Sequence, residues 1–223
     1  MELYHVLNRG VDKRNIFLDT QDRARFVHDM YEFNDAETAK NVGRLMSDFV
    51  SRSLDGGIQG SRIVELHGWC LMKNHYHLLL SETVEGGLTK FMRKLNIGYA
   101  KYFNKKYKRT GTLFQSRTKK IHISTDAHFL YILHYIHLNP LDFLRDAKDW
   151  RSGSVKNPQK ALTHLAGYRW SSYSDYCGKK NFSSILSTEL FADVFGNYQN
   201  VITKYIRDMQ TETESFFDSS SLE

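Results

Sequence analysis

The sequence predicts an α+β fold of the ferredoxin-like kind, an antiparallel sheet with helices on one face, followed by a small C-terminal helical appendage. Short segments alternate apolar and polar residues, as strands do, and longer segments repeat apolar residues at helical spacing. These segments follow one another as strand, helix, hairpin, helix, strand and helix. Because this order gives antiparallel pairing with the helices on one side, we expect the other face of the sheet to stay open.

The expected elements follow in chain order. They are a strand at 3–9, a helix from about 20 to 34, strands at 62–71 and 75–81 around a turn at 72–74, a helix at 88–107, a strand at 113–123 and a helix at 125–139. Asp19 or Thr20 can cap the first helix, and Thr125 or Asp126 can cap the last. That last helix is expected to end near Asn139, because the residue before a proline avoids helical geometry.

The domain organisation predicted from composition is one main domain and an appendage. We assign residues 1–145 to the main domain, with an insertion at 35–60 that ends in a stretch with Gly56, Gly57 and Gly60. Residues 146–207 form the helical appendage, and residues 145–165, where it joins the main domain, look like a charged connection. The segment 208–223 has five acidic residues and no basic one, so we expect it to be disordered.

The composition is that of a globular protein and excludes several other classes. The chain has 223 residues, of which 41% are hydrophobic and 25% charged. It lacks a run of roughly 18 to 20 apolar residues, and its start lacks a basic, apolar leader, so we expect a soluble cytoplasmic protein with no membrane partner. Cys70 and Cys177 lie far apart in sequence, which argues against a disulfide framework and against a cysteine zinc site.

The positive charge is concentrated in one segment. The net charge is only +6, but residues 93–120 contain ten basic residues and no acidic one. Five aromatic residues lie within the same segment. A polyanion with stackable bases would use both features, so nucleic acid is the indicated partner. A solvated basic helix whose aromatic residues face the core is the alternative.

A histidine pair lies on the second strand of the hairpin. His75 and His77 are two residues apart, so they share one face of that strand, while Tyr76, Leu78 and Leu80 share the other. Two neutral imidazoles on one strand can converge on one divalent ion. Two partly exposed strand histidines without a metal are the alternative interpretation, so a third ligand has to come from elsewhere.

The helix at 125–139 offers oxygen ligands and a nucleophile. Tyr131, Tyr135 and Asn139 are spaced four residues apart and lie on one helical stripe. A site with two histidines and an oxygen ligand accepts Mg²⁺ or Mn²⁺ together with a phosphate, and a nearby tyrosine can attack the phosphorus and form a phosphotyrosine. On spacing alone, both tyrosines also fit the role of core aromatic residues.

Six motifs in order resemble the REP-associated tyrosine transposases, which are relatives of the IS200-like single-tyrosine HUH transposases. The motifs span most of residues 3–207 and are Asn8-Arg9-Gly10, Gly68 to Leu79 with the histidine pair, Gly98 to Asn104, Leu113 to Arg117, Tyr135 to Pro140, and Trp170 to Tyr173. Six motifs in one order are far more specific than any one of them.

The resemblance implies a function and a role for each site residue. It implies that His75, His77 and Asn139 hold a single Mg²⁺ or Mn²⁺ and that Tyr135, rather than Tyr131, Tyr99 or Tyr102, is the nucleophile. It also implies a single-stranded, hairpin-forming DNA substrate, a 5′-phosphotyrosine intermediate, no nucleotide cofactor, and a location at the nucleoid. The basic residues chosen as DNA contacts are Arg9, Arg93, Lys101, Arg109 and Arg117.

Some residues depart from the family pattern, and two other functions stay open. Tyr76 stands between the histidines in place of an aliphatic residue, Lys73 stands where a proline is frequent, and the 35–60 segment is longer than usual. Relatives differ between monomers and composite-site dimers, so a homodimer is left open. One alternative function is a domesticated hairpin-binding protein without catalysis. The other is a hydrolase with zinc held by His75, His77 and one of His122, His134 or His137.

Overall fold

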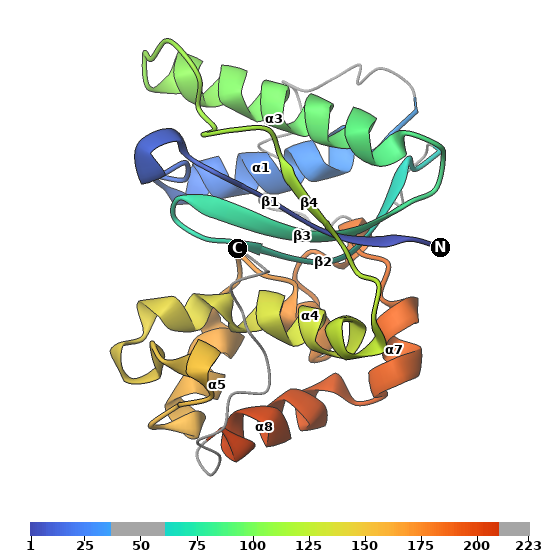
Figure 1. Cartoon of the computed structure of the whole chain (residues 1–223). Helices are drawn as coiled ribbons and strands as arrows, with labels where there is room; N and C mark the ends of the chain where they lie inside the picture. The colour runs from blue at the N-terminus through green and yellow to red at the C-terminus, as the bar shows by residue number, and fades with distance from the viewer. Residues whose placement is uncertain (37–60, 210–223) are drawn as a thin grey trace.

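The computed structural model describes residues 1–36 and 61–209, and its centre is a four-stranded antiparallel sheet in the order β2-β3-β1-β4 (Figure 1). The strands are β1 (Leu3–Arg9), β2 (Val64–Leu71), β3 (His75–Glu82) and β4 (Lys119–His122). With the helices α1 (Thr20–Glu32) and α3 (Gly87–Lys106) the chain runs β1-α1-β2-β3-α3-β4. This connectivity confirms the ferredoxin-like α+β class.

One face of the sheet packs against α1 and α3, as the sequence predicts. Tyr76, Leu78 and Leu80 point from β3 into this core. The predicted cap of α1 is also present: the Asp19 carboxylate accepts a hydrogen bond from the backbone N–H of Asp22, and the Asp22 carboxylate accepts one in return. Gly98 lets the two helices approach closely, because a Cβ there would lie 2.5 Å from the ring of Phe33.

The other face of the sheet is covered, so the expectation of an open face is wrong. The helix α4 (Asp126–Leu138) lies across it, and the appendage packs beneath, as Figure 1 shows. The sheet residues Leu3, Cys70 and Leu79 join Leu133 and Ile136 of α4 in a second buried core. The helices of the appendage contribute side chains to the same core and so complete the burial of this sheet face. They are α5 (Pro158–Gly167), α6 (Tyr173–Tyr176), α7 (Glu189–Phe195) and α8 (Tyr198–Asp208).

The appendage also covers the outer edge of β2. Ser171 forms an antiparallel bridge with Cys70, and the Leu71 N–H donates to the Trp170 carbonyl at 2.9 Å. The Ser172 hydroxyl accepts the Trp69 N–H at 2.9 Å, and the Ser172 N–H donates to the Trp69 carbonyl at 3.0 Å. The Trp170–Tyr173 motif therefore pairs with an edge strand whose peptide groups would otherwise need water.

Several boundaries differ from those expected. Residues 145–165 are not a simple charged connection. They contain short 3-10 turns at Arg145–Ala147 and Trp150–Ser152, and α5 begins at Pro158, where Asn157 caps it and Ala161 and Leu165 face the core. The last strand is only Lys119–His122, preceded by an isolated bridge between Gly10 and Phe114.

Most of the predicted insertion and nearly all of the predicted acidic tail lie outside the described residues. In the described part of the chain, no helix is both long and apolar enough to cross a bilayer.

Candidate active site

The histidine pair lies on the sheet face that α4 covers. On β3, His77 is opposite Leu7 of β1 and Cys70 of β2, and His75 is opposite Arg9. The ring centroids of His75 and His77 are 4.9 Å apart. His77 is 1% exposed, whereas His75 is partly exposed. The pair thus sits on the predicted face, but that face is closed rather than open.

A third histidine, which the sequence analysis did not select, completes this cluster. His5 of β1 is fully buried, and its Nε2 lies 2.9 Å from Nδ1 of His77. Alternation along residues 3–9 places His5 on one strand face. Only the antiparallel register, with His5 opposite Leu79, shows that this face is the one that carries His77.

Helix α4 brings the predicted tyrosine against the histidines. Thr125 caps this helix by accepting the N–H of His128, as predicted. The ring centroid of Tyr135 lies 5.7 Å from that of His77 and 5.8 Å from that of His5. Tyr131 lies one turn earlier and packs against Tyr205 of α8.

Asn139, at the C-terminal end of α4, is held by two polar contacts. Its Nδ2 donates to the Tyr135 carbonyl at 2.8 Å, and its Oδ1 accepts from Arg151 at 2.9 Å. Arg151 also forms an ion pair with Asp142, with N–O distances of 2.6 and 3.1 Å. Its guanidinium lies 5.8 Å from the centre of the Tyr135 ring, so a cation faces the predicted nucleophile.

Trp150 and Arg151 are site residues that the sequence reasoning missed. The ring of Trp150 lies 5.6 Å from that of Tyr135, and Tyr135 itself is 0% exposed. Both residues belong to the segment interpreted as a charged connection. A tryptophan beside an arginine in a charged stretch was the available signal, but nothing in the sequence places that stretch over α4.

The histidines of the cluster are uncharged at neutral pH. Burial, with a smaller effect of the Arg9 charge, lowers the pKa of His75 to about 4. Burial and the neighbouring histidines lower the pKa of His77 well below its ordinary value, and burial lowers the pKa of His5 to about 3. Neutral imidazoles keep a lone pair, which is the form that binds a metal ion.

The donor types of His75, His77 and Asn139 suit a divalent cation that takes nitrogen and oxygen ligands. Nε2 of His77 is buried and has no hydrogen-bond partner among residues 1–36 and 61–209. Nδ1 of His75 lies 2.7 Å from Oδ1 of Asn74, which fixes that proton on Nδ1 and leaves Nε2 bare. Oδ1 of Asn139 has a second lone pair beside the one that Arg151 uses. Two imidazoles and a carboxamide are a set that Mg²⁺ or Mn²⁺ can accept.

The alternative of a zinc hydrolase required a third histidine, His122, His134 or His137, beside His75 and His77, and none of these three is grouped with the pair. Within the described ranges, no three His, Cys, Asp or Glu side chains are grouped so that they could hold a metal. The ring of His122 packs at a tilt against that of Tyr4, with centroids 5.2 Å apart, and His134 and His137 turn toward Tyr198 of the appendage.

The predicted DNA contacts divide between the two faces of the sheet. Arg9 is opposite His75, and Gln115 binds the Arg9 carbonyl, which brings the loop that carries Arg117 to the same end of β1. Arg93 and Lys101 lie on α3, on the opposite face. Arg109 follows α3, where its guanidinium donates to Asn104.

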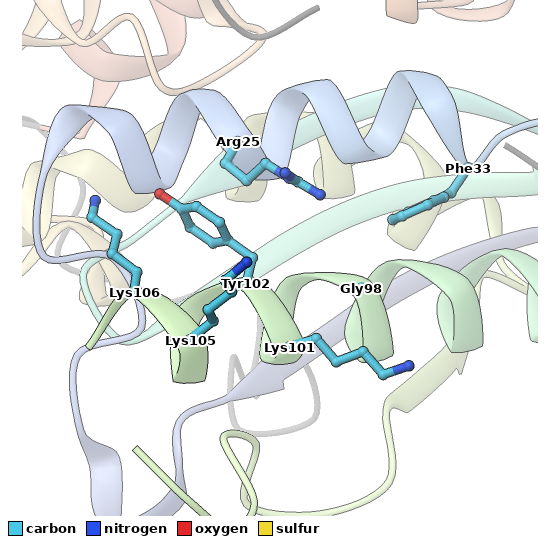
Figure 2. A pocket seen from close by; sticks show the side chains of 7 residues that line it. All are labelled: Arg25, Phe33, Gly98, Lys101, Tyr102, Lys105 and Lys106. Atoms are coloured by element: carbon cyan, nitrogen blue, oxygen red, sulfur yellow. The ribbon is translucent and has the colours of Figure 1, made fainter. Parts of the chain in front are cut away.

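Lys101 borders a hollow of about 660 Å³ between α1 and α3, shown in Figure 2. Its lining residues are Arg25, Phe33, Gly98, Lys101, Tyr102, Lys105 and Lys106. Arg25 is paired with Asp29 at 2.7 Å, and Lys106 is paired with Asp19 and Asp22. In the described part of the chain, Lys101 and Lys105 form no ion pair, so they alone give this hollow its unneutralised charge.

Together, the fold and the site define an α+β protein with a candidate active site of two histidines, a tyrosine and an asparagine beneath its sheet. Residues 46–139 match the family model of the IS200-like transposases. The matched segment contains His75, His77, Tyr135 and Asn139, and over these residues the resemblance to the IS200-like transposases is confirmed.

Other comparisons add the following. The chain is similar to a solved structure of a REP-associated tyrosine transposase bound to a REP hairpin, with 12% identity and a TM-score of 0.45 over 83% of this chain and 85% of that chain. No curated protein matches the chain.

Proposed function

We propose that this protein is a transposase-type enzyme: a metal-dependent endonuclease and strand transferase that acts on hairpin-forming, single-stranded DNA through a 5′-phosphotyrosine. The observation that supports it most is the contact of Tyr135 with His77, at 5.7 Å between ring centroids, within the segment that matches the IS200-like transposases. The basic segment at 93–120 supports a polyanionic substrate.

In the proposed reaction, the Tyr135 oxygen attacks a phosphodiester phosphorus. The bond from tyrosine oxygen to phosphorus forms as the bond from phosphorus to the 3′ oxygen breaks, and the phenolic proton passes through solvent to the departing 3′-OH. A single Mg²⁺ or Mn²⁺ held by His75, His77 and Asn139 would stabilise negative charge on the phosphoryl group. Because the phosphotyrosine keeps the energy of the broken bond, rejoining needs no nucleotide cofactor.

The closed site sets one requirement for this chemistry. Tyr135 is fully buried and packs against Trp150, and Arg151 holds Asn139. A phosphodiester therefore reaches the phenol only if part of this packing opens, and in this proposal the part that opens is the turn Trp150–Ser152. Arg9 lies near His75 and Arg151 near Tyr135, and in this proposal both cations contact the DNA backbone.

The test is formation of a covalent adduct between the protein and labelled single-stranded DNA that carries a hairpin-forming inverted repeat, chosen by a search of the DNA on either side of the gene, with Mn²⁺ or Mg²⁺ present. We expect wild type to give an adduct that resists denaturant, and Tyr135→Phe to give none. Tyr131→Phe is the matched control, one turn away on the same helix, and should keep the adduct. An adduct that survives in Tyr135→Phe would overturn the proposal.

A second candidate is a catalytically silent protein that binds hairpin DNA. The full burial of Tyr135 favours it. Tight hairpin binding without any adduct, under either metal, would support this candidate over the enzyme.

A further inference from the structure

The cluster contains one imidazole that the proposed chemistry does not use. His5 is fully buried between two elements of the site: its ring centroid lies 5.1 Å from that of His77 and 5.8 Å from that of Tyr135. Its Nε2 lies 2.9 Å from Nδ1 of His77, which is the nitrogen on the opposite side of the ring from the atom that could bind a metal.

The two rings can share their protons in only two ways. Each neutral imidazole carries one N–H. If His5 donates from Nε2, then His77 is protonated at its own Nε2, and this buried N–H has no acceptor among the described residues. If His77 donates from Nδ1, its Nε2 keeps a bare lone pair, and the buried N–H without an acceptor among the described residues is Nδ1–H of His5 instead, so this cost is the same in both arrangements. Only this second arrangement lets Nε2 of His77 bind a cation.

We propose that His5 is a positioning residue that accepts the Nδ1–H of His77 and so presents Nε2 of His77 to the divalent ion. The inference rests on the proposed function, because it concerns the same metal site. Metal-bound histidines usually donate their second N–H to a carboxylate, a carbonyl or water, and this bond fixes both tautomer and ring orientation. Here the neutral imidazole of His5, on the neighbouring strand β1, accepts this N–H.

Among the described residues, His5 is the one hydrogen-bond partner of Nδ1 of His77. The strands β1 and β3 are hydrogen-bonded neighbours that fix the two Cα positions. The position opposite His77 on β2 is Cys70, whose sulfur lies 3.8 Å from Sδ of Met72. Losing the His5 acceptor would therefore free the His77 ring to rotate or to protonate at Nε2.

The test measures metal binding by the full-length protein without DNA, by titration with Mn²⁺ and detection of the free ion by electron paramagnetic resonance. We expect His5→Phe, which keeps an aromatic ring but has no acceptor, to raise the Kd for Mn²⁺ by 10- to 100-fold. His5→Gln, whose amide oxygen can accept the bond, should recover most of that loss. His122→Phe, an exposed histidine on β4, is the matched control and should leave the Kd unchanged.

The outcomes separate this inference from the proposed function. Unchanged Mn²⁺ affinity in His5→Phe, together with lost affinity in His77→Ala, overturns the role of His5 and leaves the metal site intact. Wild-type affinity in His77→Ala overturns the metal site itself, and His5 with it.

A measurement on wild type covers the case in which His5→Phe does not fold. Nitrogen-15 shifts of the Mg²⁺-loaded protein should show His5 protonated at Nδ1 and bare at Nε2. His5 protonated at Nε2 would contradict the proposal.

Discussion

Removing one hydroxyl, in Ser172→Ala, tests how the appendage is joined to the sheet. Ser172 is fully buried, and its Oγ contacts three groups: the backbone N–H of Trp69 at 2.9 Å, Nε2 of His137 at 2.8 Å and, more weakly, the Trp69 carbonyl at 3.3 Å. His137 in turn binds the Tyr198 hydroxyl through Nδ1 at 2.9 Å. One side chain therefore connects β2, α4 and α8.

The expected cost follows from the groups that lose a partner. Alanine leaves the Trp69 N–H and Nε2 of His137 buried and unpaired, at about 1–3 kcal/mol each, so the free energy of unfolding should fall by about 2–6 kcal/mol. Since a domain is usually stable by only about 5–15 kcal/mol, this is a large fraction. Ser152→Ala, at an exposed serine, is the control and should change stability by no more than about 0.5 kcal/mol.

Urea unfolding followed by tryptophan fluorescence measures this effect, since Trp69 and Trp170 lie beside Ser172 along the β2 edge. The midpoint should fall while the slope stays constant. Adding His137→Phe to Ser172→Ala should cost less than the sum of the single changes, because both remove the same bond. A loss in Ser172→Ala no larger than that in Ser152→Ala would refute this account of the junction.

Two further predictions concern pH and DNA. The free energy of unfolding of the metal-free protein should decrease as pH falls below about 6.5, by more than about 1 kcal/mol per pH unit, because the unfolded histidines take up protons there while the folded ones, with lowered pKa values, do not. Urea unfolding at pH 7.5, 6.5 and 5.5 checks this, and equal stability at all three contradicts it. The histidines concerned are His5, His75, His77, His134 and His137. For DNA, Arg9→Gln should weaken binding and reduce the slope of log affinity against log salt by about 1, whereas the exposed Lys180→Gln should not. Fluorescence anisotropy over a salt series measures the affinity and the slope. Equal slopes for wild type and Arg9→Gln would show that Arg9 does not contact the DNA backbone.

Local patterns were sufficient for the elements on which the site is built. Alternation placed His75 and His77 on one face of β3, and Thr125 caps the helix that carries Tyr135. That helix ends at Leu138, close to the expected position, but the reason given for it was wrong, because Asn139 keeps helical geometry and the chain continues through Pro140 as a 3-10 helix, Asn139–Phe143. The convergence of Tyr135 with His77 also matches expectation. Its choice over Tyr131 came from the family resemblance, because both tyrosines occupy the same helical stripe.

Long-range packing could not be read in the same way. The position of His5 beside His77 depends on strand register between residues 72 apart in sequence. The closure of the site by Trp150 and Arg151 depends on where the appendage packs, and no local pattern encodes that. The covered face was missed because the apolar residues of α4 are spread around the helix, which leaves it buried on the sheet side and on the appendage side alike.

The bridge between Ser171 and Cys70 also restricts how copies of this protein can associate. A sheet can be extended into a second molecule only from an edge whose peptide groups are free. The Trp170–Ser172 segment already pairs with part of the β2 edge. The other edge strand of the described sheet is β4, which carries Lys119 and Lys120. Like charges facing each other across a twofold axis would repel there, so continuous-sheet pairing is disfavoured at both borders.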